Sequence, residues 1–464
     1  MKTLSGNYAE DVSSLDGILR SGESFDLLRR ECAFSGIRET FFYIEGFVAG
    51  DMMQKLMNYM AGVKTVGDAA SFSSSLPAVE ASVSNDLDEL AFSVLSGKSV
   101  MMAETFGAAA VIIDSRSYPA REGTEPENDR VLRGSRDGFV ETLMFNTAMV
   151  RRRIRSPEVR VEYARAGSVT RCDVALCYMA DRVDGKMLEK LRGALSDLGT
   201  SSVVLGHESI AESLVKKRWY DPFPKFRLTE RPDVAAASVL EGSVILLVDN
   251  SPEAILFPTS ILDFLQEADD FYFPPFTGTY LRILRHIVFL LSIILVPLWY
   301  LAVMNADTLP AWLKFCVPDD PGGIPIIFQL FLVEFSLDGL KLAYLNTPDT
   351  LSSSVSVVGG LLLGDFAVKV GWLSPDVILY MAFASVANYT QSSYELGYAF
   401  KYLRMITLAL TAVGGIWGFS GGILLGILLV GLNRSFGGKS YLYPLIPFNG
   451  TALKRLLFRP KKFD

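Results

Sequence analysis

Hydrophobic residues are distributed unevenly along the chain, and the pattern changes sharply near Tyr280. The run from Ile287 to Met304 contains no charged residue over 18 positions, and the run from Met405 to Asn433 contains none over 29. About 20 apolar residues are enough to cross a bilayer as a helix. Residues 281–435 are therefore predicted to form an α-helical transmembrane bundle.

Two further apolar stretches, Ile324 to Leu345 and Val355 to Asn388, contain charged residues. A charge at membrane depth is costly unless it faces protein or water, so these stretches indicate a bundle interior or an ion path. Positive residues precede the first run and end the chain, which predicts cytoplasmic termini and an even number of spans. Four or six spans satisfy this rule, and four are preferred. Either residues 324–345 are re-entrant or interfacial, or the 29-residue run folds back as a hairpin.

The first 280 residues are more polar and predict two soluble subdomains of α+β or α/β class. Phe41, Ile44 and Val48 follow helical spacing, and AAAVIID reads as a buried strand. Alternating strand and helix patterns begin near residue 139. The predicted segments are a flexible N-terminus (1–24), a mainly helical subdomain (25–114), a linker (115–138), a mixed α/β subdomain (139–280) and, after the bundle, a basic cytoplasmic tail (436–464).

Composition supports a membrane protein with an acidic aqueous part. Mean hydropathy is +0.29. Residues 281–464 hold 14 Lys and Arg against 10 Asp and Glu, a net of +4, which leaves residues 1–280 with 30 against 41, or −11. That acidity argues against a nucleic-acid partner. The N-terminus has no signal-peptide pattern, so the first 280 residues are expected to stay cytoplasmic.

The residue patterns of known enzymes and metal sites are missing from the sequence. The four cysteines form no CxxC pair, and the two histidines, His207 and His286, have no ligand cluster around them. The segment GGKS resembles the end of a P-loop but has Asn433 where the first glycine is required. We expect no enzymatic activity, no cofactor and no metal.

The strongest candidate site is a charged helix face. Glu334, Asp338 and Lys341 fall at i, i+4 and i+7 of an otherwise apolar helix. A ring of such faces in a homo-oligomer would line a cation path, because carboxylates offset the cost of stripping water from cations. The alternative is that Asp338 and Lys341 form a local i, i+3 pair on an interfacial helix.

Two further patterns concern the interior of the bundle. Asp365 could line the same path, although an i, i+4 pair with Lys369 explains it without any pore. Small residues let helices approach closely. For the second group of glycines named below, the alternative is that Gly421 and Gly422 break the helix. The glycines with helix-packing spacing are Gly359, Gly360 and Gly364, and then Gly414, Gly418, Gly422 and Gly426.

Three ordered clusters resemble the A-subunit family of GerA-type spore germinant receptors. The first is EGTEPENDRVLRGSRDGFVETLMFNTAMVRRRI, similar to the family's Glu-Pro and Arg-Gly-Pro-Arg-Glu-Gly-Phe signature, with Ser135 and Asp137 in place of Pro and Glu. The second is ERPD with EGSVILLVDNSP, and the third is DDFYFPPFTGTYLRILR. The matched motif residues are Glu125, Pro126, Arg133, Gly134, Gly138, Phe139, Arg231, Pro232 and Asp233.

The resemblance covers about Arg116 to the end of the chain. Receptor A subunits usually carry Glu-Ala and Arg-Leu-Pro where this chain has Leu337 to Leu342 and Asn346 to Pro348. The resemblance implies an inner-membrane protein of the bacterial spore that forms oligomeric ion channels and acts when ions and calcium dipicolinate leave the core. Its partners would be the lipid bilayer, further copies and other germination membrane proteins. The alternatives are a non-conducting scaffold or regulatory subunit and, last, a secondary transporter, which would favour an internal repeat.

Overall fold

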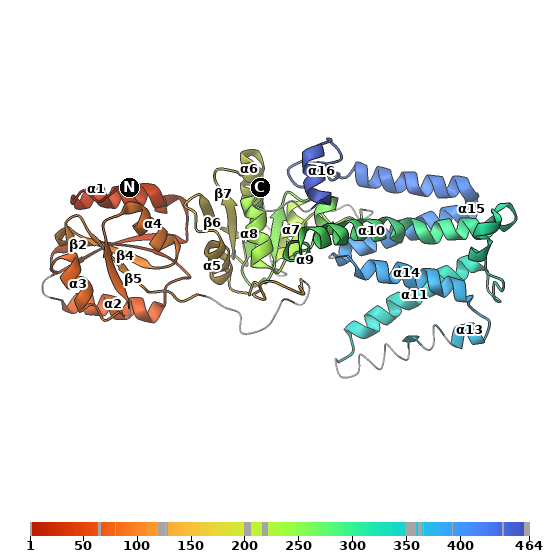
Figure 1. The fold of residues 1–464 in the computed structure, drawn as a ribbon, viewed down its shortest axis with the longest axis horizontal. Coiled ribbons are helices and arrows are strands. Elements are labelled where there is room, and N and C mark those ends of the chain that lie inside the picture. The colour runs from red at the N-terminus through yellow and green to blue at the C-terminus, as the bar shows by residue number, and fades with distance from the viewer. Residues whose placement is uncertain are drawn as a thin grey trace. The chain divides into compact units, whose positions relative to one another are not determined.

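The computed structural model divides the chain into two compact units (Figure 1). Unit 1 comprises Met1–Lys216 and Phe226–Thr259, and unit 2 comprises Lys217–Lys225 and Ser260–Asp464. The described residues are 2–63, 66–78, 80–118, 126, 129–198, 206–215, 221–348, 359–360, 364, 366–391, 393–438 and 440–458.

Unit 1 contains two five-stranded antiparallel sheets, each with helices packed on it. The first sheet has the strand order β1 (Leu27–Phe34), β2 (Ile37–Ile44), β4 (Ser99–Ala103), β5 (Ala110–Ile113) and β3 (Ala81–Ser84). Helices α1 (Tyr8–Leu19) and α4 (Leu87–Leu95) pack on one face, and α2 (Gly50–Gly62) and α3 (Ala69–Ser75) on the other (Figure 1). The short 3-10 helices η1 (Ser21–Glu23) and η2 (Glu104–Phe106) complete this half.

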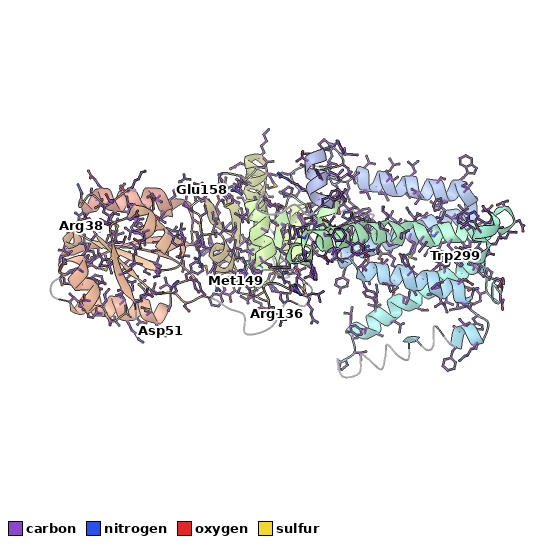
Figure 2. All side chains as sticks on the ribbon, viewed as in Figure 1. Arg38, Asp51, Arg136, Met149, Glu158 and Trp299 are labelled. Atoms are coloured by element: carbon purple, nitrogen blue, oxygen red, sulfur yellow. The ribbon has the colours of Figure 1, made fainter. Side chains whose placement is uncertain are left out.

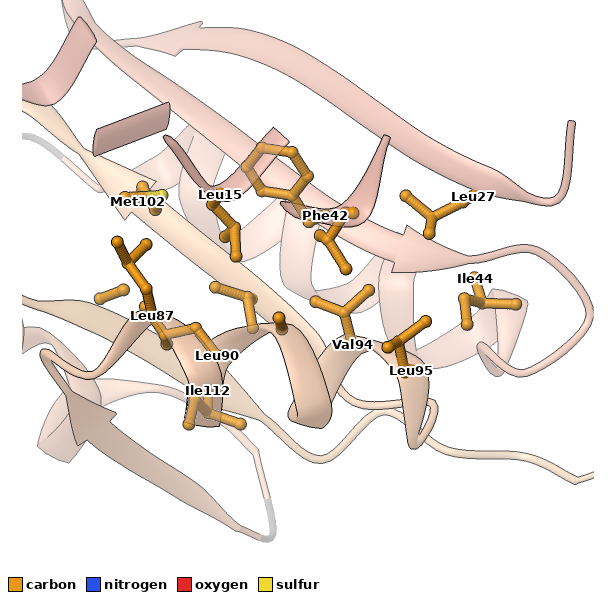
Figure 3. Close-up of a cluster of buried hydrophobic side chains, with 14 of the residues drawn as sticks. Leu15, Leu27, Phe42, Ile44, Leu87, Leu90, Val94, Leu95, Met102 and Ile112 are labelled. Carbon is orange, nitrogen blue, oxygen red and sulfur yellow. The ribbon is translucent and has the colours of Figure 1, made fainter. Parts of the chain in front are cut away.

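Apolar contacts explain why α1 and α4 lie on the same face of the first sheet. Leu15 of α1 and Leu90 of α4 are fully buried with Phe42 of β2 in one cluster (Figure 3). The Asp86 side chain caps the start of α4 by accepting a hydrogen bond from the amide of Asp88 at 2.9 Å. A capped helix with one apolar face needs a sheet or another helix to cover that face.

The prediction that residues 25–114 are mainly helical is wrong, because they hold all five strands of this sheet. Phe41 and Ile44 lie on β2, a central strand buried on both faces, where a continuous apolar run imitates the pattern of a buried helix. Ser35 and Gly36 connect β1 to β2 with φ of 53° and 82°. Positive φ at both positions is typical of two-residue hairpin turns, so this Ser-Gly pair is the signal that indicates the hairpin. The predicted strand AAAVIID is β5.

The second sheet has the order β6 (Val159–Ala166), β7 (Cys172–Met179), β9 (Val244–Val248), β10 (Ala254–Phe257) and β8 (Arg227–Thr229). Helices α5 (Leu143–Arg153) and α8 (Pro232–Leu240) share a buried cluster with it, and α6 (Gly185–Asp197) and α7 (His207–Leu214) lie between its strands in sequence. Every strand pair is antiparallel, so the unit is α+β. The alternating pattern of this half also predicts a strand at residues 202–205, which lie outside the described residues.

A buried ion pair joins the two halves of unit 1. Arg151 of α5 and Asp26 are each 1% exposed, and Arg151 Nε lies 2.8 Å from Asp26 Oδ2. Arg151 Nη2 also donates to Asp26 Oδ1 at 2.8 Å and to Ser24 Oγ at 3.0 Å. Arg151, in the basic last turn of α5, therefore holds the two halves of unit 1 together from the inside.

Unit 2 is helical. Its longer helices are α10 (Pro275–Met304), α11 (Ile326–Leu345), α14 (Pro375–Tyr389), α15 (Tyr394–Gly431) and α16 (Gly450–Leu457). The short helices are η4 (Ile261–Leu265), α9 (Asp269–Tyr272), η5 (Ala306–Thr308), η6 (Ala311–Cys316) and α13 (Ala367–Lys369). The ring of Trp299 in α10 stacks on Tyr380 of α14, with centroids 4.5 Å apart. Trp299 is labelled in Figure 2.

Helix α15 consists of two halves that fold back on each other at Gly415. This glycine has φ 55° and ψ −131°, which breaks the helix. A Cβ added to Gly418 would lie 1.8 Å from the carbonyl oxygen of Leu410, and one on Gly422 would lie 2.8 Å from Thr407 Cα. Positions later in the second half thus face positions earlier in the first half, so the two halves run in opposite directions, as in a helical hairpin.

Among the described residues of unit 2, α10 and α15, the latter with both of its halves taken together, are long and apolar enough to cross a membrane by length and composition, with mean hydropathies of 2.6 and 2.0 in their most apolar windows. Only 22% and 6% of those windows are buried. Helices with so much exposed apolar surface need lipid or protein to cover it.

Candidate functional site: a buried charge cluster in the helical unit

The predicted acidic residues of α11 meet basic residues of α15 inside unit 2. Arg404 Nη2 donates to both carboxylate oxygens of Glu334, at 2.8 and 3.0 Å. Arg404 Nη1 donates to the Ser292 carbonyl of α10 at 3.0 Å. Arg404 is 1% exposed and Glu334 is 7% exposed. One guanidinium thus ties three helices together.

Lys401 completes the cluster one helical turn before Arg404. Its Nζ forms an ion pair with Asp338 and lies 3.4 Å from Glu334 Oε1. Lys401 and Arg404 share a face of α15 at i, i+3, as Glu334 and Asp338 share a face of α11 at i, i+4. We call these four residues the charge cluster. Its formal charges, two negative and two positive, cancel.

Lys341 lies beside the charge cluster against aromatic rings. Its Nζ is 4.8 Å from the ring centroid of Tyr389 and 5.6 Å from that of Tyr398. Both distances suit a cation over the face of an aromatic ring. Among the ion pairs of the described residues, Asp338 is joined to Lys401 and not to Lys341. The local i, i+3 pair considered from the sequence is not formed.

Buried charges in a low-dielectric interior must be paired, because an unpaired charge costs several kcal/mol. The charge cluster satisfies this requirement within one chain. The carboxylates of Glu334 and Asp338 are consequently paired with cations of the same chain, whereas the ring predicted from the sequence consists of carboxylates that are free to bind passing cations. Any interaction of these oxygens with a passing cation competes with Lys401 and Arg404.

Sequence reasoning missed Lys401 and Arg404. They directly precede the uncharged run that begins at Met405, so they look like residues that flank a span at the membrane surface. Their i, i+3 spacing, matched to two carboxylates at i, i+4 on another apolar helix, is the signal that could have found them.

Contacts along the helices also fix their relative directions. Phe289 packs on Phe400, with centroids 4.3 Å apart, and Ser292 meets Arg404, so α10 and the first half of α15 run parallel. Gln329 Oε1 accepts from the amide of Ser374 at 2.8 Å, near the starts of α11 and α14. Lys341 reaches Tyr389 near their ends. Helices α11 and α14 therefore run in the same direction.

The predicted packing glycines differ in what surrounds them. Gly359 lies against Leu340 of α11, since an added Cβ would be 2.3 Å from Leu340 Cδ2. Gly426 faces Leu403 at 3.6 Å across the α15 hairpin. Gly360, Gly364 and Gly414 have open space where a Cβ would be. Asp365 lies outside the described residues.

The motif residues of unit 1 hold a loop in place. Arg231 is 1% exposed; its Nη2 lies 2.8 Å from Asp233 Oδ2 and donates to the Ser135 carbonyl at 2.8 Å. Pro232 occupies the first turn of α8, where its missing N–H is not needed. The amide of Phe139 donates to the Glu230 carbonyl at 2.8 Å. Gly134 has a φ of 128°. Of the remaining motif residues, Arg133 is exposed, and the buried ones are Pro126, Gly138 and Phe139. Glu125 lies outside the described residues.

One Ser-His-Glu arrangement in unit 1 was not visible in the sequence. His207 Nδ1 lies 2.6 Å from Ser251 Oγ, and His207 Nε2 lies 2.7 Å from Glu253 Oε2. Ser251 is 2% exposed, so its hydroxyl is closed to a substrate, and the contacts fasten α7 to the β9–β10 turn. No group of three His, Cys, Asp or Glu side chains that could hold a metal occurs among the residues with described positions.

Comparisons with known proteins agree with the motif resemblance. The family model of the Bacillus/Clostridium GerA spore germination protein matches residues 15–463. Stage V sporulation protein AF of Bacillus subtilis is 39% identical over 81% of this chain and 76% of its own length. The uncharacterized membrane protein YfkQ of the same organism is 28% identical over 99% of this chain and 90% of its own length.

Among solved structures, the N-terminal domain of the A subunit of the Bacillus megaterium spore germinant receptor GerK3 aligns with 55% of this chain and 96% of that domain. It does so at 24% identity and a TM-score of 0.40. By the family model and the sequence identity over most of its length, the chain belongs to the GerA family of spore germination proteins.

Proposed function

We propose that this chain is an oligomeric ion-channel subunit in the inner membrane of the bacterial spore, and that it helps to release ions, calcium dipicolinate or both during germination. The observation that carries the proposal is the charge cluster, which brings four ionisable side chains together inside a unit with two candidate membrane-spanning helices. Ionisable groups at membrane depth are expensive and most often serve ion or proton pathways.

The helix directions favour an even number of crossings of the membrane. Helix α10 and the first half of α15 run one way, and α11, α14 and the second half of α15 run the other. Arg282 Nη1, near the start of α10, donates to the carbonyls of Arg455 and Leu456 of α16 at 3.2 Å each. Both ends of unit 2 then lie on one side, which we take to be the cytoplasmic side.

In this arrangement the charge cluster corresponds to a closed state. Its carboxylates are neutralised by Lys401 and Arg404, so they do not attract cations from solution. Moving α11 away from α15 would expose Glu334 and Asp338 as a pair of acidic groups, and a ring of such pairs in a homo-oligomer would lower the barrier for cations. Conduction thus requires the cluster to open.

Release of cargo from liposomes tests the proposal. The purified chain is reconstituted into vesicles loaded with potassium salt or with calcium dipicolinate, and release of each is followed separately. We expect release that Glu334→Gln changes and that Asp307→Asn, an exposed carboxylate of the same unit, leaves unaltered. Vesicles that retain both cargoes with folded, oligomeric protein would contradict a channel formed by this chain alone.

A non-conducting scaffold or regulatory subunit that docks other germination membrane proteins is the second candidate. It is favoured by the same pairing, because a cluster of zero net charge also suits a purely structural tie between α10, α11 and α15. A scaffold predicts that replacing Glu334 and Arg404 together by apolar residues preserves its function, whereas a channel predicts altered release.

A further inference from the structure

The segment that follows α15 presents apolar side chains to its surroundings. Leu445, Ile446 and Phe448 lie in the loop before α16, and Phe458 follows α16; their exposed fractions are 43%, 57%, 73% and 51%. Exposed apolar side chains grouped in one short segment mark a binding surface more often than chance.

This segment is fixed to unit 2 on its inner side, so its position is defined. Tyr441 is fully buried, and its hydroxyl donates to the Pro224 carbonyl at 2.7 Å. Asn449 caps α16 by accepting from the amide of Ala452 at 3.1 Å. Leu456 lies in a buried cluster with residues of α15. The exposed apolar residues are therefore the outer face of an ordered element.

The anchoring contact of α16 places the segment near the beginning of the first candidate span. Arg282 donates to the last carbonyls of α16 and lies five residues before the uncharged run that starts at Ile287. Five residues of α-helix rise about 7–8 Å. The headgroup layer outside each face of the hydrocarbon core is about 5–8 Å thick. The segment thus lies at headgroup level if α10 spans the membrane.

Charge identifies the kind of surface that the segment fits. Lys454 and Arg455 are exposed in the last turn of α16, between Phe448 and Phe458 in the sequence. Apolar side chains that enter the acyl boundary beside basic ones that meet headgroups are typical of elements that lie on membranes. Each Lys or Arg near an anionic leaflet contributes about 1 kcal/mol to such binding.

We propose that residues 443–458 form a membrane-surface anchor, in which Leu445, Ile446 and Phe448 enter the interface and Lys454 and Arg455 bind the phosphates of anionic lipids. The inference rests on the membrane placement of unit 2 proposed above. The anchor holds α16 and, through Arg282, the first turns of α10 at a fixed depth. Its occupant is the anionic leaflet itself and not a soluble ligand.

Tryptophan quenching by brominated lipid tests the anchor in the full chain. Phe448→Trp is placed in nanodiscs of anionic lipid with and without brominated acyl chains, and the parent protein is measured in parallel. We expect the emission added by the new tryptophan to be blue-shifted and to lose most of its intensity in brominated lipid. Phe92→Trp, an exposed phenylalanine of α4 in unit 1, is the matched control that stays unquenched.

The parent protein separates failure of the anchor from failure of the placement. Trp417 of α15 is exposed and must be quenched if unit 2 lies in the bilayer. If the parent protein is quenched but the tryptophan at position 448 is not, the anchor is overturned and the membrane placement of unit 2 stands. The same conclusion follows if the tryptophan at position 448 emits as in water and its emission shifts only when a partner protein is added. No quenching in either protein overturns both. Ile446→Trp repeats the test if the first variant misfolds.

The basic residues are tested separately by lipid composition. Replacing Lys454 and Arg455 by Gln should reduce the quenching at position 448 in anionic nanodiscs and leave it unchanged in zwitterionic ones. The Arg455 carbonyl, which Arg282 binds, is kept in this variant. Equal quenching in both lipids with and without the two cations would contradict recognition of anionic headgroups.

Discussion

Arg404→Met is the substitution whose effect follows most directly from the charge cluster. It removes two hydrogen bonds to Glu334 and one to Ser292, and it leaves a buried carboxylate with reduced compensation. Breaking a buried ion pair from one side costs about 3–5 kcal/mol. Lys401 Nζ remains 3.4 Å from Glu334, so we expect the lower end of that range, about 3 kcal/mol, or roughly a hundredfold in the folded-to-unfolded ratio.

The assay is unfolding of the full chain in mixed micelles by added SDS, followed by circular dichroism. Glu334→Met with Arg404→Met should recover most of the lost stability, because two apolar side chains replace a buried pair at little net cost. The stability of Arg404→Lys should lie between those of the parent protein and Arg404→Met, because one ammonium cannot reproduce the guanidinium's hydrogen bonds to both Glu334 and Ser292. Arg434→Met, an exposed arginine of the same unit, is the control and should change stability by less than about 0.5 kcal/mol.

Two results would refute the reasoning. If Arg404→Met destabilises no more than Arg434→Met, the pair with Glu334 is not buried as described. If the double replacement costs as much as the sum of the two single ones, the residues are not energetically coupled, because coupling appears as non-additivity.

Three further predictions concern packing, the join within unit 1 and pH. Gly422→Leu should prevent closure of the α15 hairpin and abolish the yield of monodisperse protein, because a Cβ there would lie 2.8 Å from the facing backbone, whereas Gly414→Ala should be tolerated. Arg151→Met should destabilise unit 1 by about 3–5 kcal/mol in urea by leaving Asp26 unpaired. Burial raises the pKa of Glu39 to about 7 from 4.5. Folded unit 1 therefore keeps a proton that the unfolded chain has lost, and its stability should fall by about 3 kcal/mol as pH rises from 4.5 to 7.

Each of these has an outcome that would contradict it. Normal yield of Gly422→Leu with an intact hairpin would show that the two halves of α15 are farther apart. Arg155→Met, at an exposed arginine just after α5, should be near neutral, and an equal loss of stability in both variants would remove the special role of the ion pair. Glu39→Gln should flatten the pH dependence, and an unchanged slope would place its origin at another group.

Parts of the fold could be predicted because local patterns decide them. The uncharged runs mark α10 and the α15 hairpin, and the spacing of Leu87, Leu90 and Val94 marks α4. The first sheet could not be predicted from periodicity, because β2 is covered on both faces and its apolar run has no alternation. A strand of that kind is determined by its neighbours in space and not by its own sequence.

The candidate site was half predictable. Glu334 and Asp338 are conspicuous because they interrupt an apolar helix, and a charge in apolar surroundings demands an explanation. Their partners lie more than 60 residues away, at the start of a helix where cations look ordinary. Which charges neutralise each other depends on the antiparallel register of α11 and α15, and that register follows from packing that a single sequence does not reveal.

The most direct test of the central claim is the single-channel conductance of the purified chain in planar bilayers. A channel lined by the charge cluster should give discrete currents whose amplitude or gating changes in Glu334→Gln and Asp338→Asn and stays unchanged in Asp307→Asn. Silent bilayers with protein shown to be folded, oligomeric and inserted, or currents that none of the cluster variants alters, would contradict an ion path through the charge cluster.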